Sequence, residues 1–240
     1  MKKKVMINIC IVFLLIICIY SFIKIYQKYN TKKEIEQVNN IVISPDNEND
    51  IEYLRKQYNN DDIIGILNIA SINTILVQGK DNDFYLDHLI NKEENKTGSV
   101  FVDYRQNINS AKQLNIYGHS SDYYDLPFNV LLNYSDFEFY KENKYAEIIT
   151  EDKTYKYEIF GVNMTTNEEH LKFDFSTSDD FKKHLEILQE DNLYDTNVKV
   201  DETDEILIIQ TCINNDKRGN LLIIILRKVE EKWKKSKKYY

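Results

Sequence analysis

The sequence predicts a mainly β domain that follows an N-terminal transmembrane helix. Two observations lead to this prediction: an unbroken apolar run near the N-terminus, and beyond it a series of short β-rich runs separated by turn residues. About eight strands at such spacing are typical of a closed barrel or a sandwich. The expected strands are Ile63–Ile69, Thr74–Val77, Ser99–Val102, Gln113–Tyr117, Ala146–Thr150, Tyr155–Val162, Val198–Val200, Ile206–Gln210 and Leu221–Leu226.

The N-terminal segment has the length and composition of a membrane anchor. A lysine cluster, Met1–Lys4, precedes the apolar run Val5–Ile23, and a helix of that length rises about 28 Å, enough to cross a hydrocarbon core. A cleaved signal peptide would have a shorter apolar run and small residues at a cleavage site, which are missing here. We therefore expect residues 1–27 to be a retained anchor in the cell membrane. Lysines flank both sides of the apolar run, so the excess of positive charge on cytoplasmic flanks does not decide the orientation. We expect a cytoplasmic N-terminus and an extracellular body by analogy with simple single-pass anchors.

The rest of the chain divides by composition. Residues 28–60 are polar and are expected to form a stalk with a helix around Asp50–Gln57. Residues 61–230 hold the expected strands, and residues 231–240 form a basic tail.

Two helices are expected within the body. Phe84–Ile90 is short, and Asp179–Glu190 is longer. The longer helix has apolar residues at positions i, i+4 and i+7, so one face should pack on the sheet. Ser178 is expected to cap its N-terminus.

The charge pattern disfavours nucleic acid as a partner. The net charge is −8, and residues 1–33 hold lysines but no acidic residue, so the body is more acidic than the whole chain. Phosphate binding needs a basic surface. No His/Cys spacing typical of a metal site is present, and neither a metal nor a cofactor is expected.

Cys212 is the first candidate for chemistry. Cys10 and Cys18 lie in the apolar run, so the body has one cysteine and can hold no internal disulfide. Cys212 follows the expected strand Ile206–Gln210 and precedes the polar segment Asn214–Asn220. Such a thiol is either a small hydrophobic residue at the edge of the core or an accessible nucleophile held on a rigid element.

His119 favours the second interpretation. It lies just past the end of the strand Gln113–Tyr117, after the turn residue Gly118. The other three histidines, His88, His170 and His184, fall in helical patterns or a charged loop, and we expect them at the surface. A Cys/His pair suits acyl transfer, because the imidazole helps generate the thiolate and then protonates the leaving amine.

An arginine would complete such a site. Arg218 lies six residues after Cys212, where a guanidinium could stabilise the oxyanion formed by attack on a carbonyl. Arg227, at the end of the last strand, is the alternative, although we expect it at the surface. The sequence leaves the choice between these two open.

Five segments resemble motifs of the sortases, and most closely those of class B sortases. They are Asp62–Gly65, Ile75–Leu86, Gly98–Asp103, Asn115–Ser120 with its histidine, and Ile209–Cys212 with its cysteine. The likeness covers about residues 50–229. The order of the motifs makes the set specific, and the helix between the late strands is similar to class B rather than to the shorter class A.

The resemblance implies an eight-stranded sortase-type barrel and a thioester mechanism. Cys212 would attack a Thr carbonyl in the C-terminal sorting signal of a secreted surface protein, with an NPxTN-like or xPxTG-like motif. An amine from a peptidoglycan precursor, or a pilin lysine, would resolve the acyl-enzyme. His119 would be the general acid/base, and Arg218 would position the carbonyl.

The sequence departs from the family at two places near the nucleophile. Gln210 stands where Ser or a small apolar residue is usual, and the interval between Cys212 and Arg218 is short. The alternative function is thus a catalytically inactive sortase-fold tether or binding domain at the cell surface. Papain-like peptidases place Cys before His, and L,D-transpeptidases place the two close together, so both classes fit poorly.

Overall fold

The computed structural model describes residues 2–39, 51–166, 168–213 and 220–234. The chain divides into two compact units, Met1–Val42 and Ile43–Tyr240. Arg218, and the tail beyond residue 234, lie outside the described residues.

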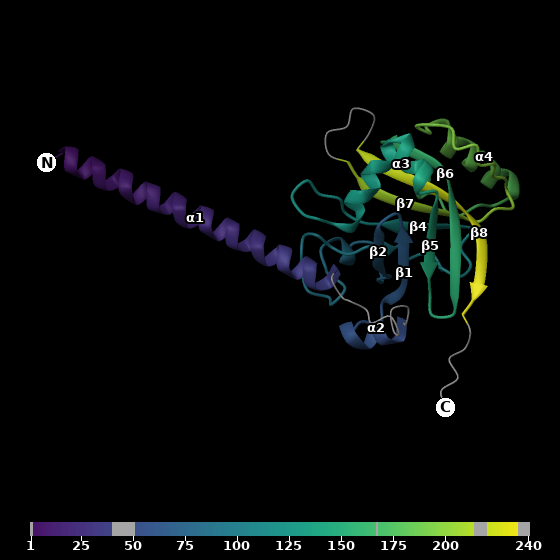
Figure 1. Ribbon diagram of the computed structural model, residues 1–240, viewed down its shortest axis with the longest axis horizontal. Coiled ribbons are helices and arrows are strands. Elements are labelled where there is room, and N and C mark those ends of the chain that lie inside the picture. Colours follow the sequence, from purple (N-terminus) through teal and green to yellow (C-terminus); the bar gives the residue numbers. More distant parts are fainter. Residues whose placement is uncertain (1, 40–50, 167, 214–219, 235–240) are drawn as a thin grey trace. The chain divides into compact units, whose positions relative to one another are not determined.

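The described residues of the first unit form one helix, α1 (Lys2–Asn39), drawn in purple in Figure 1. Its segment Met6–Gln27 has 22 residues and a mean hydropathy of 2.8, which makes it long and apolar enough to cross a membrane. The apolar helix predicted from the sequence is therefore present. It continues to Asn39, into the residues predicted as a stalk, because lysine, glutamate and glutamine there are good helix formers.

Eight strands of the second unit close into a barrel in the order β1-β2-β3-β4-β7-β8-β6-β5 (Figure 1). This confirms the barrel and excludes the sandwich. The pairs β2/β3 and β4/β7 are parallel, and the other neighbours are antiparallel. The strands are β1 (Ile63–Ile69), β2 (Ile72–Val77), β3 (Phe101–Val102), β4 (Gln113–Tyr117), β5 (Tyr145–Ile149), β6 (Lys153–Thr165), β7 (Ile206–Cys212) and β8 (Leu221–Trp233).

Helices lie before the first strand and in the connections between strands. The expected strand Val198–Val200 is wrong, because these residues lie in an irregular segment beside the core. The expected helix Phe84–Ile90 is only a single 3₁₀ turn. The helices of the second unit are α2 (Ile51–Tyr58), η1 (Phe84–Leu86), η2 (Pro127–Ser135), α3 (Phe137–Glu142), η3 (Glu169–Leu171) and α4 (Ser178–Glu190).

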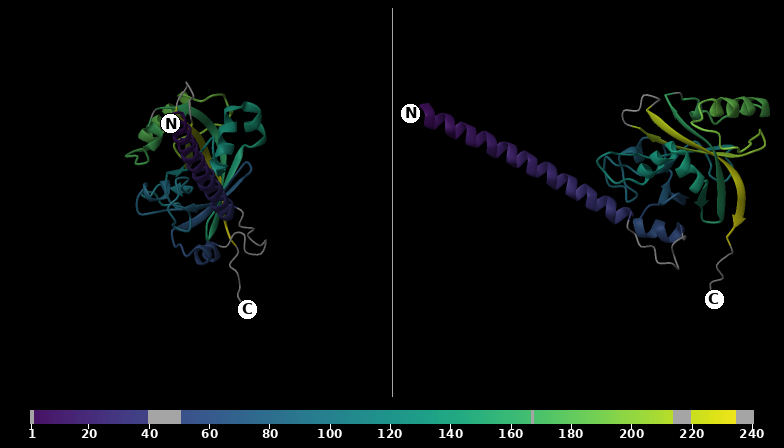
Figure 2. Two further views of the ribbon diagram at one scale, coloured as in Figure 1. Left: turned by 90° about the vertical axis from the view of Figure 1, so that its left-hand side faces the viewer. Right: turned by 45° about the horizontal axis from the view of Figure 1, so that its top comes forward.

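The cap of α4 differs from the expectation by one residue. Thr177 is the N-cap: its backbone is extended, and its hydroxyl accepts a hydrogen bond of 3.1 Å from the Asp180 N–H. Ser178 is already the first helical residue, so its side chain cannot fill the same role. Helix α4 lies over the β6–β8 side of the barrel (Figure 2).

Strand β7 is buried on both faces, which explains its unbroken apolar sequence. Leu207 and Ile209 pack in the barrel interior, whereas Ile206 and Ile208 pack against α4. Alternate residues of a strand point to opposite faces. A strand that is packed on both faces is a rigid support for the side chain of its last residue.

Candidate active site

Cys212 is the last residue of β7 and is exposed, although Thr211 beside it is buried. It pairs with Leu221, the first residue of β8. The structure therefore places the thiol at the end of a strand that is buried on both faces. It is not a small hydrophobic residue in the core.

His119 reaches the same end of the barrel because β4 and β7 run parallel. Tyr117, the last residue of β4, is in register with Gln210 of β7. The residues that follow each strand therefore continue side by side. The predicted pair, which is 93 positions apart in the sequence, is brought to neighbouring strand ends.

Three hydrogen bonds hold the two segments together on either side of the histidine. They link a backbone amide, a threonine hydroxyl and a serine hydroxyl to carbonyl oxygens of the opposite segment. The bonds are Gly118 N–H to Gln210 O at 3.2 Å, Thr211 Oγ1 to Gly118 O at 2.9 Å and Ser120 Oγ to Cys212 O at 2.5 Å.

The imidazole of His119 has a fixed tautomer. Its Nε2 lies 2.8 Å from the carbonyl oxygen of Leu86, the last residue of η1. A carbonyl can only accept, so Nε2 carries a proton, and Nδ1 is the basic nitrogen of the neutral ring. Among the described residues, the sulfur of Cys212 makes no hydrogen bond to this ring. The ring orientation is thus set by η1 and is independent of the thiol.

Cys212 and His119 line one cavity of about 300 Å³. Leu86 of η1 and Leu171 of η3 also border it, so two connections between strands form walls around the thiol. The volume is at the lower end of the range for small-ligand sites. A side chain or a short stretch of peptide fits such a space.

The structure describes one of the two candidate arginines, Arg227. Arg218 lies outside the described residues. Arg227 pairs in register with Ile206, the first residue of β7, whereas Cys212 is the last, which places Arg227 about 20 Å along the strand from the thiol. Its guanidinium donates to Glu158 at 2.8 Å. Arg227 is therefore not part of this cavity.

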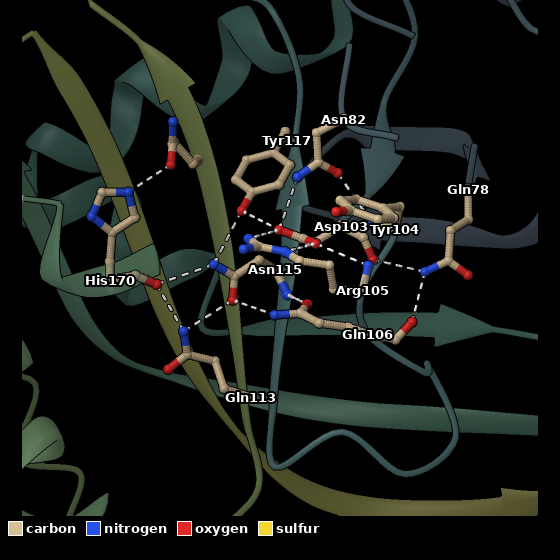
Figure 3. Close-up of polar contacts among 11 residues, drawn as sticks. Gln78, Asn82, Asp103, Tyr104, Arg105, Gln106, Gln113, Asn115, Tyr117 and His170 are labelled. Atoms are coloured by element: carbon tan, nitrogen blue, oxygen red, sulfur yellow. Dashed lines mark hydrogen bonds and ion pairs between the residues drawn. The ribbon is translucent and has the colours of Figure 1, made fainter. Parts of the chain in front are cut away.

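Sequence reasoning missed Arg105, which borders the cavity. Its Nε and Nη2 donate to the two oxygens of Asp103 at 2.9 and 2.7 Å (Figure 3). The Asp103 side chain is fully buried, whereas the Arg105 side chain is 41% exposed. Of the described residues around the cavity, Arg105 is the only Lys or Arg. An Asp and an Arg two positions apart after a short strand do not by themselves predict a functional site. Only the fold shows that Arg105 borders the cavity.

The carboxylate of Asp103 remains ionised although it is buried. Burial opposes ionisation, but donors from Arg105, Asn82 and Tyr117 outweigh it and hold the pKa of Asp103 below its usual value. Asn82 Nδ2 and the Tyr117 hydroxyl each lie 3.0 Å from Oδ2. This carboxylate fixes three residues of the cavity wall.

We expect Asp103→Asn to lower the free energy of unfolding by about 2 kcal/mol at pH 7, because charge-assisted hydrogen bonds are lost. A depressed folded-state pKa contributes stability above the unfolded pKa of about 4 and loses it as the pH falls through the folded value. The difference between the two proteins should shrink below pH 4. Urea unfolding followed by circular dichroism at pH 7 and pH 3 measures it. An equal difference at both pH values would contradict the assignment.

Two histidines expected at the surface are buried. His170 and His184 are each 1% exposed, so the surface interpretation was wrong for both. Each ring is buried against an amide of the barrel: His170 Nε2 lies 2.6 Å from Gln210 Oε1, and His184 Nε2 lies 2.6 Å from Gln113 Oε1. Burial lowers the pKa of His184. Across the described residues, no group of three or more His, Cys, Asp or Glu side chains is placed to hold a metal ion.

Comparison with known proteins gives one consistent family, although no family model matches. The chain is 26% identical over 248 residues to sortase B of Staphylococcus aureus, covering 95% of this chain and 98% of the relative. It is 34% identical over 158 residues to sortase B of Listeria monocytogenes, covering 64% and 63%.

Solved structures agree. The structure of the Listeria monocytogenes enzyme matches with a TM-score of 0.64 and 31% identity, over 72% of this chain and 97% of that chain. Clostridium perfringens sortase B matches with a TM-score of 0.67 and 29% identity, over 75% and 100%.

Proposed function

Because the chain belongs to the class B sortases, a family of cysteine transpeptidases, we propose that it cleaves the C-terminal sorting signal of a secreted surface protein after Thr and transfers the acyl group to a cell-wall amine. The observation that supports this best is the placement of an exposed thiol and a histidine on one cavity, at the ends of adjacent parallel strands. Nucleophile and base on rigid strand ends are what acyl transfer requires.

In the first half of the reaction, Cys212 is the nucleophile. Its thiolate attacks the Thr carbonyl carbon, a C–S bond forms, and the C–N bond of the peptide breaks. The leaving amine takes a proton from Nδ1 of the His119 imidazolium. The Leu86 carbonyl, which accepts from Nε2, stabilises that imidazolium before it gives up the proton.

In the second half, an amine attacks the thioester. His119 Nδ1 accepts the proton that the amine loses, and the Cys212 thiolate leaves as the new amide bond forms. We propose a peptidoglycan precursor as the acceptor. A pilin lysine offers the same chemistry.

Arg218 is our candidate for stabilising the oxyanion. It lies in the connection between β7 and β8, whose two ends meet beside the nucleophile: the Ile213 N–H donates to the Asn220 carbonyl at 2.8 Å. An arginine in this connection would supply a guanidinium that stays charged and can hydrogen-bond a carbonyl under attack.

We further propose that α1 anchors the enzyme in the cell membrane, with its N-terminus in the cytoplasm and the barrel outside the cell. The length and hydropathy of Met6–Gln27 support the anchor. This arrangement would present the cavity to sorting signals that have crossed the membrane.

The function is tested with the full chain in detergent micelles and a panel of NPxTN and xPxTG peptides. We expect mass spectrometry to detect cleavage after Thr, transfer to an added amine, and an acyl adduct on Cys212. The Cys212→Ala protein is the control. A folded chain that gives neither turnover nor adduct across the panel would favour the inactive tether.

A further inference from the structure

We propose that the side-chain amide of Gln210 binds a main-chain carbonyl of the peptide substrate and that His170 positions this amide. The proposal rests on the proposed function. Gln210 borders the same cavity as Cys212 and lies two residues before it on β7. Residues i and i+2 of a strand point to the same face, about 7 Å apart. The amide is therefore a near neighbour of the thiol.

The orientation of the amide is set by His170. The imidazole Nε2 lies 2.6 Å from Gln210 Oε1, so the ring donates and the amide oxygen accepts. With its oxygen engaged, the amide has its NH₂ group left to offer. In the described part of the chain, no residue accepts a hydrogen bond from that NH₂. Its natural acceptor in a peptide-binding cavity is a carbonyl oxygen.

His170 is itself held from a second side. Its main-chain carbonyl accepts from Gln113 Nε2 at 2.7 Å and from Asn115 Nδ2 at 3.1 Å, both on β4 (Figure 3). The residue is 1% exposed, so neither contact competes with solvent. These bonds fix the main chain of His170 against β4, and the burial of the residue limits rotation of its ring away from Gln210.

The same contacts place the next residue of η3. Leu171 borders the cavity directly after His170. One buried histidine thus sets both a polar donor and an apolar wall of the peptide site. An extended peptide advances about 3.3 Å per residue, so the Gln210 amide serves a carbonyl about two residues from the one attacked by Cys212.

The test measures peptide affinity in the full chain carrying Cys212→Ala, with fluorescent NPxTN and xPxTG peptides in detergent micelles. Gln210→Glu is the decisive variant, because the carboxylate still accepts from His170 but has no N–H to donate. We expect its Kd to rise about fivefold, the loss of about one neutral hydrogen bond. His170→Leu should weaken binding similarly, and His170→Gln, which keeps a donor at the same reach, should restore most of it.

Two results would overturn the proposal. One is a Kd for Gln210→Glu within twofold of the parent in a folded protein. The other is full additivity of His170→Leu with Gln210→Met, since a positioning residue and the group that it positions should not add. With Cys212 intact, Gln210→Glu should raise KM more than it lowers kcat. Peptide that binds but is never cleaved would remove the proposed function and leave this inference standing.

Discussion

Replacement of Cys212 by Ala is expected to abolish transpeptidation and to shift the thermal midpoint by less than about 2 °C. The thiol is exposed and makes no hydrogen bond within the described residues, so its removal costs little packing energy. The chemistry, by contrast, has no substitute. An Ala methyl group cannot form the thioester through which both halves of the reaction pass.

The measurement is release of the C-terminal fragment from the preferred peptide, read by mass spectrometry, with a melting curve on the same sample. A matched control replaces Cys10 and Cys18 by Ala, which leaves Cys212 as the only thiol of the chain. That protein should retain full activity and take up one equivalent of a thiol reagent. Residual turnover by Cys212→Ala above about 1% would remove Cys212 from the nucleophile role.

The sequence predicts the barrel well because its strands carry a periodic signal. The expected bounds of β1 and β4 agree with the structure to the residue, and the unbroken apolar run of β7 predicts the buried strand that the structure has. One expected strand is absent from the sheet. Val198–Val200 has β-branched residues but no free strand edge to pair with, so its apolar side chains pack beside α4 without joining the sheet.

The two central residues of the proposed site were also recoverable from the sequence. Both Cys212 and His119 lie within two residues of an expected strand end, and their motifs occur in the order typical of the family. The structure brings both to one cavity, as expected.

The polar surroundings were not recoverable, because they depend on pairs distant in sequence. His170 looks like a surface residue from its charged neighbours, and only the folded barrel shows the amides of β4 and β7 that bury it. The position of Arg105 beside the nucleophile is visible only in the folded chain, where η1, β4 and β7 border the same cavity. Gln210, which looks like a departure from the family, has a partner that only the fold reveals.

Replacement of His119 by Ala is expected to lower kcat/KM about a thousandfold, within the range of general acid–base catalysis. The leaving amine must gain a proton as the C–N bond breaks, and the acceptor amine must lose one. Nδ1 of His119 is the group we assign to both transfers, since Nε2 is bonded to Leu86. A loss below about tenfold would remove His119 from this role.

Two comparisons separate acid–base chemistry from a structural effect. His88→Asn is the matched control: His88 lies two residues from Leu86 but does not border the cavity, and Asn keeps a donor for the Phe84 carbonyl that lies 2.8 Å from His88 Nδ1. Its activity should stay within about threefold of the natural chain.

The second comparison replaces the scissile amide by an ester. An alkoxide or phenoxide leaves with less need of a proton, so His119→Ala should cost far less on that substrate than on the peptide. An equal loss on both would mean that the histidine acts by holding η1 and the cavity wall in place, because a proton donor matters only where the leaving group needs the proton.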